Sequence, residues 1–334
     1  MPQDEKPLVV LAGDIGGTNT RLALFSGKTR IPEPILSKTY ASRKSPDLES
    51  ILDDFLQDVA YDISSACFGV AGPVANGVSR ITNLPWEISE NNLKNRFQWP
   101  RVHVINDINA AARAIPLLQH HDLFVLNKGI RLPDSPIGIL APGTGLGMAL
   151  MILHHNAYLP IPSEGGHMDF APNSDLQVRL WQHLHENLGH VSIERILSGP
   201  GLVTIYSWIK QAGLAAEPPD LAQRLKNEDP AQVISETAIN QNIPICVQAL
   251  DLFISVFGAV AGNLALAGFT RGGIYLGGGI VPKILPAFES PAFMSAFENK
   301  GRFQKTMQQI PVRVVLHKQP ALLGAAAFAL TDEI

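Results

Sequence analysis

The stretch Ala12-Gly13-Asp14-Ile15-Gly16-Gly17-Thr18-Asn19-Thr20-Arg21 lies between two apolar runs, residues 8–11 and 22–25, and the rest of the chain is best understood around it. The runs predict two strands joined by a turn. Glycines can adopt positive φ and let a ligand approach the backbone, and turn N–H groups can cradle phosphate oxygens. A Gly-Gly pair that only closes a tight hairpin is the alternative. The polar residues from Thr18 to Arg21 favour phosphate binding.

The amino-acid composition limits the classes of protein to which the chain can belong. The chain has 334 residues, of which 46% are hydrophobic and 17% charged, as expected for a well-packed protein of two domains. A net charge of −4 argues against nucleic acid as the main partner. Cys67 and Cys246 are far apart and are expected to be buried thiols in a reducing compartment. Residues 1–7 lack a secretory apolar core, so we expect a cytoplasmic protein.

One segment resembles a membrane span. Residues 252–269 carry no charge and place Gly258 and Gly262 in a G-x-x-x-G spacing. The run is short for a span, contains Asn263, and continues a helical pattern that begins near Pro230. We therefore expect a helix buried on all sides and no membrane partner.

The order of apolar patterns predicts alternating strands and helices, hence an α/β protein with mixed, largely parallel sheets. In the first part of the chain we expect Ser45 to cap the first helix. The expected strands are 35–40, 64–72, 77–81, 101–105, 137–141, 148–153, 273–276 and 312–316, and the expected helical regions are 46–60, 89–96, 108–115, 176–188, 201–212, 219–225, 230–267 and 321–330.

A second hairpin repeats the first. The turn Gly143-Thr144-Gly145-Leu146-Gly147 again lies between apolar runs, about 130 residues after the opening turn, which indicates duplicated α/β units. Gly27-Lys28-Thr29 is not the end of a P-loop, because Leu22 stands where the first glycine is needed. The second turn enters a strand rather than a helix, so NAD and FAD are not indicated.

Six ordered motifs resemble bacterial glucokinase. They are Gly13 to Arg21, Val104-Ile105-Asn106-Asp107, Gly143 to Gly147, Ser163-Glu164-Gly165-Gly166-His167-Met168-Asp169-Phe170, Glu194 to Gly201, and Gly277-Gly278-Gly279-Ile280-Val281-Pro282. The resemblance implies a two-domain actin-like ATPase (ribonuclease H-like) fold with duplicated five-stranded mixed sheets and an interdomain cleft for ATP and glucose. It places a small domain at residues 1–113, completed by a C-terminal helix at 318–334, and a large domain with helical insertions at 114–317.

The residues around His167 and at the start of the chain indicate which group of glucokinases the chain resembles. No cysteine lies near His167, so the chain resembles the zinc-free group rather than the repressor-related one, and no zinc is expected. The first strand begins by Leu8, which leaves no room for an N-terminal helix-turn-helix. Likeness to the family also suggests a homodimer.

The same resemblance implies the sugar site. Asp107 would be the general base for the sugar 6-hydroxyl, although a helix N-cap is the alternative role for this residue. Asn106, Glu164, His167 and Glu194 would bind sugar hydroxyls, with Thr82 and Asn83 as second-rank candidates. Gly165 and Gly166 suggest close approach of the ligand. A metal site formed by Glu164, His167 and Asp169 is a rival, but no further ligand of suitable spacing is evident.

On the nucleotide side, the resemblance assigns Asp14 to Mg²⁺, directly or through water. Phosphate would contact two glycine turns, and the third glycine turn would face adenosine unless it is only a strand-to-helix turn. The residues are Gly13, Asp14, Ile15, Gly16, Gly17 and Thr18 in the first turn, Gly143, Thr144 and Gly145 in the second, and Gly277, Gly278 and Gly279 in the third.

The expected reaction is transfer of the γ-phosphoryl of ATP to the 6-hydroxyl of D-glucose, with Mg²⁺ as cofactor. A kinase for fructose or mannose is one alternative. A sugar-binding sensor without catalysis is another, and the presence of Asp107 argues against it.

Overall fold

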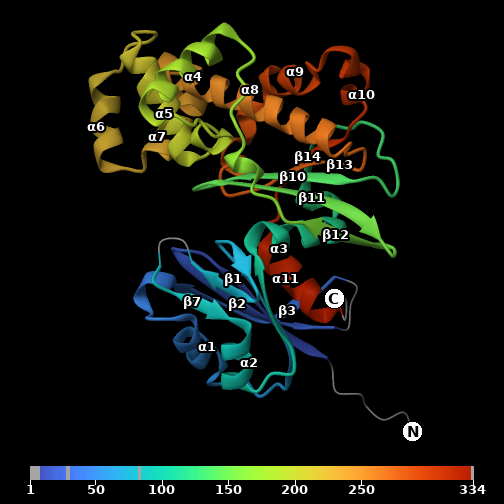
Figure 1. The fold of residues 1–334 in the computed structure, drawn as a ribbon. Helices are drawn as coiled ribbons and strands as arrows, with labels where there is room; N and C mark the ends of the chain where they lie inside the picture. Colours follow the sequence, from blue (N-terminus) through green and yellow to red (C-terminus); the bar gives the residue numbers. More distant parts are fainter. Residues whose placement is uncertain (1–7, 28–30, 82–83, 332–334) are drawn as a thin grey trace. The chain divides into compact units, whose positions relative to one another are not determined.

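The predicted opening hairpin forms the centre of a five-stranded sheet in the computed structural model of the chain, which describes residues 8–27, 31–81 and 84–331 (Figure 1). The sheet has the order β3-β2-β1-β4-β8. Its strands are β1 (Val9–Ile15), β2 (Asn19–Ser26), β3 (Glu33–Ala41), β4 (Ile63–Val70) and β8 (Val102–Asn106). β1, β4 and β8 run parallel, so their carboxyl ends meet at one edge of this sheet.

Successive apolar side chains of β1 point to opposite faces of the sheet, which explains why helices cover both faces. Val9 and Leu11 belong to a core shared with α1 (Leu48–Leu56) and α2 (Glu90–Phe97). Val10 and Ala12 belong to a second core shared with α3 (Asp107–Ala114) and α11 (Pro320–Leu330). Because a Cβ on Gly324 of α11 would collide with the carbonyl oxygen of Ala110, the two helix backbones are in direct contact there.

The start of α1 differs from the prediction. Asp47, rather than Ser45, is the N-cap, and its Oδ1 accepts a hydrogen bond from the Ser50 N–H at 2.8 Å. The helix ends at Leu56 instead of Ala60. An ionised carboxylate at the N-cap also interacts favourably with the helix dipole, which a serine two residues earlier would not do as well.

By their internal contacts, the described residues divide into two compact units. The first comprises the residues up to Gln119, Tyr158–Pro160 and those from His317 onward, and the second comprises His120–Ala157 and Ile161–Leu316. The first unit also contains a three-stranded sheet of β5 (Val74–Ala75), β6 (Val78–Arg80) and β7 (Glu87–Ser89). The predicted domain boundaries at residues 113 and 317 stay a prediction.

The second large sheet has six strands, whereas five were predicted. Its order is β12-β11-β10-β13-β14-β9. The strands are β9 (Leu123–Asn127), β10 (Ile137–Pro142), β11 (Leu146–His154), β12 (Ala157–Ile161), β13 (Gly273–Leu276) and β14 (Val312–Val315). The two edge strands β9 and β12 were not predicted. β9 pairs antiparallel with β14, and its Phe124 and Val125 are both about two-fifths exposed, so it lacks the buried–exposed alternation that reveals a strand.

Helices pack against the second sheet. Leu140, Leu276 and Val314 from the sheet share one core with Phe253 and Phe257 of α8. The helices are α4 (Asp175–Leu188), α5 (Gly199–Gln211), α6 (Pro219–Asn227), α7 (Pro230–Gln241), α8 (Pro244–Ala267), α9 (Ala292–Glu298) and α10 (Gln304–Gln308). The predicted helical region 230–267 is thus two helices, because Asn242 adopts left-handed backbone and Pro244 begins the next helix.

Helix α8 is the helix buried on all sides that the sequence predicted. Among the described residues it alone is long and apolar enough to cross a membrane, and 78% of its most apolar window is buried inside the protein. Gly258 and Gly262 face α9, where a Cβ on Gly258 would collide with the Phe293 carbonyl and one on Gly262 would lie 2.6 Å from the Phe297 carbonyl. The G-x-x-x-G spacing therefore serves close packing within the protein core.

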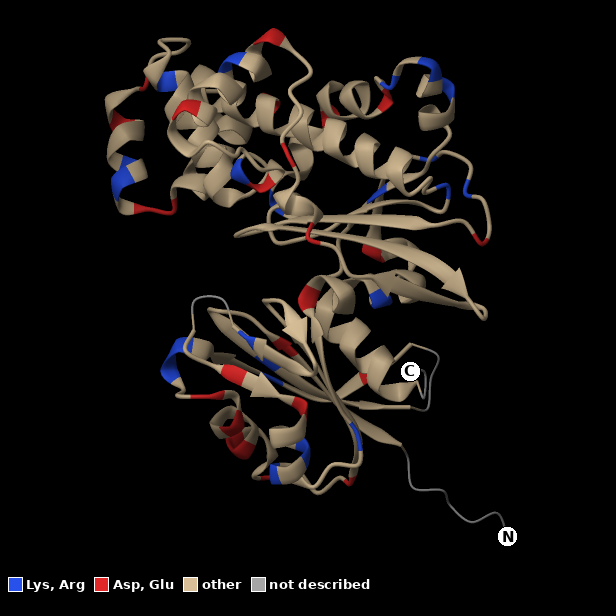
Figure 2. Cartoon of the chain, in the orientation of Figure 1, with Lys and Arg blue, Asp and Glu red and all other residues tan. Residues whose placement is uncertain are grey.

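Both cysteines are free and buried, as predicted. Burial raises the pKa of Cys246 to about 11, so this thiol is unreactive at neutral pH. Acidic and basic residues are interspersed along the chain in each unit (Figure 2).

Candidate active site

The first glycine turn is held by a serine that the sequence did not single out. Gly16 N–H donates to the Asn19 carbonyl at 2.9 Å and closes the turn. Ser42, in the short 3₁₀ helix η1 (Ser42–Lys44), donates from Oγ to the Gly16 carbonyl at 2.8 Å and from N to the Thr18 carbonyl at 2.9 Å. Neither Gly16 nor Gly17 is among the described residues with positive φ, so left-handed backbone is not the reason for glycine here.

Asp14 faces Arg21 across the hairpin. The two residues are directly opposite in the β1–β2 register, and Arg21 Nη1 donates to Asp14 Oδ2 at 3.0 Å. Burial raises the pKa of Asp14 above its ordinary value, and the charge and hydrogen bond of Arg21 oppose this shift. The Asp14 side chain keeps 20% of its surface exposed, so the carboxylate is oriented yet reachable.

Asn106 and Asp107 occupy the same edge of the first sheet, where β8 ends and α3 begins. Asn106 is the N-cap, since its Oδ1 accepts from Ile108 N–H at 3.0 Å, while its Nδ2 donates to the Gly72 carbonyl at 3.0 Å. Asp107 Oδ1 also accepts from Ile108 N–H, at 2.8 Å. The capping role considered for Asp107 is therefore shared, and Asn106 holds the N-cap position.

Gly69 on β4 brings Asp107 close to β1. A Cβ at this position would lie 2.9 Å from Ala110 Cβ, 3.6 Å from the Gly13 carbonyl oxygen and 3.8 Å from Asp107 Cα. The missing side chain lets the start of α3 approach the sheet. The carboxylate-bearing residues Asp14 and Asp107 consequently belong to one edge of the first unit.

The second glycine turn is tied to Glu194. Gly143 N–H donates to the Gly145 carbonyl at 2.8 Å, and Gly199 N–H donates to the Gly143 carbonyl at 2.8 Å. Leu146 N–H donates to Glu194 Oε2 at 2.8 Å. A Cβ on Gly145 would lie only 2.5 Å from the same oxygen. The predicted phosphate turn and a predicted sugar residue are thus in direct contact in the second unit.

The segment that carries Glu164 and His167 runs beside Glu194. Ile193 N–H donates to the Met168 carbonyl at 2.9 Å, and Asp169 forms a β-bridge with Ser192. Glu164 and His167 are both exposed. These contacts bring the segments of the three predicted sugar residues together.

Gly165 and Gly166 have a packing reason that the sequence does not reveal. A Cβ on Gly165 would collide with Met148 Sδ, and one on Gly166 would collide with the Leu146 carbonyl oxygen. Both glycines therefore let this loop pack on β11, and close approach of a ligand to them stays a prediction.

The third glycine turn follows β13. Gly277 N–H donates to the Leu140 carbonyl at 2.8 Å. Gly278 has φ +85°, and a Cβ there would collide with the Pro142 carbonyl oxygen. The structure thus accounts for Gly278 through backbone conformation and packing, while a Cβ on Gly279 would meet no atom within 4 Å. Gly279 lines a cavity instead.

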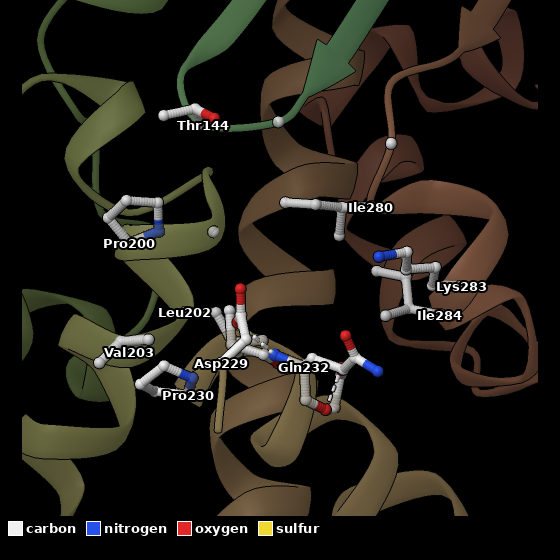
Figure 3. A pocket seen from close by; sticks show the side chains of 15 residues that line it. Thr144, Pro200, Leu202, Val203, Asp229, Pro230, Gln232, Ile280, Lys283 and Ile284 are labelled. Carbon is white, nitrogen blue, oxygen red and sulfur yellow. Dashed lines mark hydrogen bonds between the residues drawn. The ribbon is translucent and has the colours of Figure 1, made fainter. Parts of the chain in front are cut away.

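This cavity has a volume of about 580 Å³ and lies within the second unit (Figure 3). Of the predicted residues it contains Gly143, Thr144 and Gly279. Gly199, Pro200 and Ile280 also line it, and they belong to two of the quoted motifs, which gave them no site role. The lining residues that the sequence analysis missed are Leu202, Val203, Asp229, Pro230, Ala231, Gln232, Ser235, Lys283 and Ile284. They come from the starts of α5 and α7 and from the segment after the third glycine turn, and N-termini of helices favour anions.

The start of α7 gives the cavity its acidic group. Asp229 is the N-cap of α7, and its Oδ1 accepts from Gln232 N–H at 3.0 Å. The Asp-Pro pair at 229–230 is a helix-start signal that could have drawn attention to this position, although it does not reveal a cavity.

Two predicted sugar residues, Thr82 and Asn83, lie outside the described residues. Within the described part of the chain, no group of three or more His, Cys, Asp or Glu side chains could hold a metal ion. The rival metal site at Glu164, His167 and Asp169 is therefore not formed. Asp169 instead lies 3.0 Å from His190 Nε2.

Comparison with known proteins identifies the family. A family model described as Glucokinase matches residues 11–332. A glucokinase of Nostoc punctiforme is 38% identical over 336 residues, which cover 96% of this chain and 98% of that protein. The chain belongs to the glucokinase family. A glucokinase of Tolumonas auensis is 39% identical over 321 residues, with 96% of each chain covered.

Membership of the glucokinase family confirms the predicted resemblance and the expectation of a phosphotransferase enzyme. The crystal structure of a glucokinase from an Antarctic psychrotroph matches with a TM-score of 0.84 and 33% identity over 96% of this chain and 98% of that one. A ROK family glucokinase from Streptomyces griseus, solved with glucose and AMPPNP, matches with a TM-score of 0.63 and 21% identity over 96% of this chain and 99% of that one. The predicted actin-like ATPase fold is thereby confirmed.

Proposed function

We propose that this member of the glucokinase family transfers the γ-phosphoryl of ATP to the 6-hydroxyl of D-glucose and yields glucose 6-phosphate and ADP. The observation that carries the proposal is the edge of the first sheet, where Asp107, Asp14 and the first glycine turn lie together around Gly69. Phosphoryl transfer needs a base for the attacking hydroxyl beside groups that bind and neutralise the phosphates. The named activity of the relatives supports glucose as the acceptor.

Asp107 acts as the general base in this proposal. Its Oδ1 accepts from Ile108 N–H, which orients the carboxylate at the start of α3, where the helix dipole favours negative charge. The proton of the sugar 6-hydroxyl moves to this carboxylate as the oxygen attacks the γ-phosphorus. Asn106 binds a neighbouring sugar hydroxyl with the hydrogen-bonding capacity that Gly72 and Ile108 leave.

ATP binds through the glycine turns and the cavity. Backbone N–H groups of the turns at 16–18 and 143–145 hold the phosphates, with Gly13 and Ile15 beside the first turn. The cavity of about 580 Å³ accommodates adenosine, and its size is in the range of small-molecule sites. Pro200 and Ile280 supply apolar surface for the base (Figure 3), and Gly277, Gly278 and Gly279 form the adjoining loop.

Asp14 fits a role toward Mg²⁺. This cation usually keeps several waters and takes one or two protein carboxylates together with substrate phosphates, so a lone oriented carboxylate beside a phosphate turn suffices. Bound Mg²⁺ would neutralise charge on the phosphates. Arg21 holds the Asp14 carboxylate in place through the 3.0 Å contact. No residue is proposed to bind zinc.

The sugar is held by carboxylates and an imidazole. Glu164 and Glu194 accept hydrogen bonds from sugar hydroxyls, and His167 can donate or accept one. Glu194 is fixed by Leu146 N–H, so its carboxylate enters the site oriented. Thr82 and Asn83 are proposed as further sugar contacts.

The decisive experiment is a coupled assay of the purified protein with Mg-ATP across several hexoses and phosphoryl donors. Asp107→Ala is expected to lose at least about a hundredfold in kcat and to keep glucose binding. Asp47→Ala is the matched control, because Asp47 also accepts from a backbone N–H at a helix start in the same unit. Its kcat should be unchanged.

The outcomes separate the alternatives. Absence of sugar phosphate and ADP would refute the proposal, and glucose binding without turnover would indicate a sensor. A higher kcat/KM for fructose or mannose would indicate another hexose kinase. We further propose a cytoplasmic homodimer on the basis of family likeness.

A further inference from the structure

We infer that Ser42 is a positioning residue for the nucleotide, because it turns backbone N–H groups of the first glycine turn toward the phosphates. The inference rests on the proposed function, which places ATP phosphates at this turn. Ser42 lies 26 residues after Gly16 and does not itself touch substrate in this inference.

Two carbonyl groups of the turn are engaged by this one residue. Ser42 Oγ donates to the Gly16 carbonyl at 2.8 Å, and Ser42 N–H donates to the Thr18 carbonyl at 2.9 Å. Thr20 Oγ1 lies 3.0 Å from Ser42 Oγ. Because the Ser42 hydroxyl has a single proton and gives it to Gly16, the Thr20 hydroxyl donates to Ser42.

The direction in which each of these carbonyl groups points determines where the N–H group of the next residue points. In a planar trans peptide the C=O and the following N–H point to opposite sides. The Gly16 carbonyl points to Ser42, so the Gly17 N–H points away from it. The Thr18 carbonyl also points to Ser42, so the Asn19 N–H points away as well. Two donors thereby face the side opposite η1, which is the arrangement of an anion-binding turn.

Burial makes the hydroxyl hard to replace. Ser42 and Thr20 are both fully buried, so water has no access to substitute for a missing Oγ. Alanine at position 42 would keep the N–H bond to Thr18 and the hairpin itself. It would release the peptide between Gly16 and Gly17, and it would also remove the acceptor of the buried Thr20 hydroxyl. The variant therefore changes the orientation of one phosphate donor without removing any group proposed to touch ATP.

The test compares the two substrates in one variant. Ser42→Ala should raise the KM for ATP about three- to tenfold, the effect of losing one buried hydrogen bond, and leave the KM for glucose within about twofold. Ser42→Thr, which keeps the hydroxyl, should restore most of the ATP affinity. Ser65→Ala is the matched control, because Ser65 is a fully buried serine on β4 of the same sheet whose Oγ has no hydrogen-bond partner among the described residues.

A second variant keeps the inference testable if Ser42→Ala does not fold. Thr20→Val removes the Thr20 hydroxyl and preserves the bond from Ser42 to Gly16, so it should raise the KM for ATP by less than about threefold. Equal rises in both KM values for Ser42→Ala, or an unchanged KM for ATP with a lower Tm, would overturn the inference. A Ser65→Ala effect equal to that of Ser42→Ala would do the same.

The failure of this inference is distinguishable from failure of the proposed function. If the wild-type protein does not phosphorylate glucose, the proposed reaction is refuted. Calorimetric titration with Mg-ADP then takes the place of the assay. Weaker ADP binding by Ser42→Ala than by Ser65→Ala would still support the role of Ser42, and equal binding would refute it.

Discussion

Substitution of Gly145 by alanine should damage sugar binding through Glu194. A Cβ on Gly145 would lie 2.5 Å from Glu194 Oε2, and real Cβ contacts essentially never fall below 3.0 Å. The carboxylate oxygen must therefore retreat by at least about half an ångström, since a Glu side chain moves more easily than the backbone. Its 2.8 Å bond from Leu146 N–H would then reach the outer limit of a hydrogen bond.

The magnitude follows from the type of bond that is lost. A hydrogen bond to a charged group contributes about 1.5–3 kcal/mol, which corresponds to roughly 10- to 150-fold in a binding constant. The displaced carboxylate can recover part of this by binding water, so we expect the dissociation constant for glucose to rise about tenfold. The free energy of unfolding should fall by no more than the weakened Leu146–Glu194 hydrogen bond contributes, because Gly145 does not have positive φ and the new side chain meets only a flexible carboxylate.

The assay is calorimetric titration with glucose, accompanied by thermal unfolding. Gly143→Ala is the matched control in the same turn, because a Cβ there would meet no atom of the described residues within 4 Å. A double-mutant cycle adds the mechanism: in a Glu194→Ala background, Gly145→Ala should cost no further glucose affinity.

Two results would refute this reasoning. One is a loss of glucose affinity by Gly143→Ala as large as that by Gly145→Ala. The other is full additivity of Gly145→Ala and Glu194→Ala, which would mean that Gly145 acts independently of the carboxylate.

Three further predictions follow from packing and charge. Gly258→Ala should lower the free energy of unfolding by about 2–3 kcal/mol in urea titrations, because its methyl group would collide with the backbone carbonyl of Phe293; unchanged stability would contradict the tight α8–α9 contact. Asp14→Asn should raise the KM for ATP yet keep or increase Tm at pH 7. Burial raises the pKa of Asp14 in the folded protein, so at a pH above 3.8, the pKa of this group in the unfolded chain, ionisation of Asp14 disfavours folding. A lower Tm of the variant would count against this. Burial lowers the pKa of His103 in the folded protein, so His103 takes up a proton first in the unfolded chain as the pH falls below 6.5, and the wild type loses stability there. Urea titrations at about pH 7.5 and about pH 5.5 should show that the free energy of unfolding falls less between these two pH values for His103→Gln than for the wild type. Equal falls would argue against a role of His103 in this pH dependence.

Much of the fold could be predicted because its signals are local. Both glycine hairpins, the strand 273–276 and the buried character of α8 followed from apolar runs and turns within a few residues. Two of the missed strands, β9 and β12, lie at the edges of their sheet, where one strand partner is absent and alternation fades. The N-cap of α1 was misplaced by two residues, since several polar residues before Leu48 can cap a helix.

The motifs of the site could be predicted from the sequence, but the residues that hold these motifs in position could not. Ser42 contacts Gly16 over 26 residues of chain, and no pattern near position 42 indicates a bond to the turn. The cavity combines starts of two helices with the segment 279–284, which only the tertiary fold brings together. For Gly165 and Gly166 the structure adds a packing reason on β11 that the sequence does not reveal, while close approach of a ligand to them stays a prediction.

The contact between α11 and α3 has a consequence for synthesis on the ribosome. α11 completes the core that holds Val10, Ala12, Phe25 and Cys67, yet it begins at Pro320, about 300 residues after β1. At a translation rate of about 5–20 residues per second, roughly 15–60 s pass between the synthesis of β1 and that of α11, and α11 cannot cover this apolar face of the sheet before then. The nascent chain therefore presents a binding surface for chaperones until the last helix emerges, and ribosome stalling before that point would leave an aggregation-prone product.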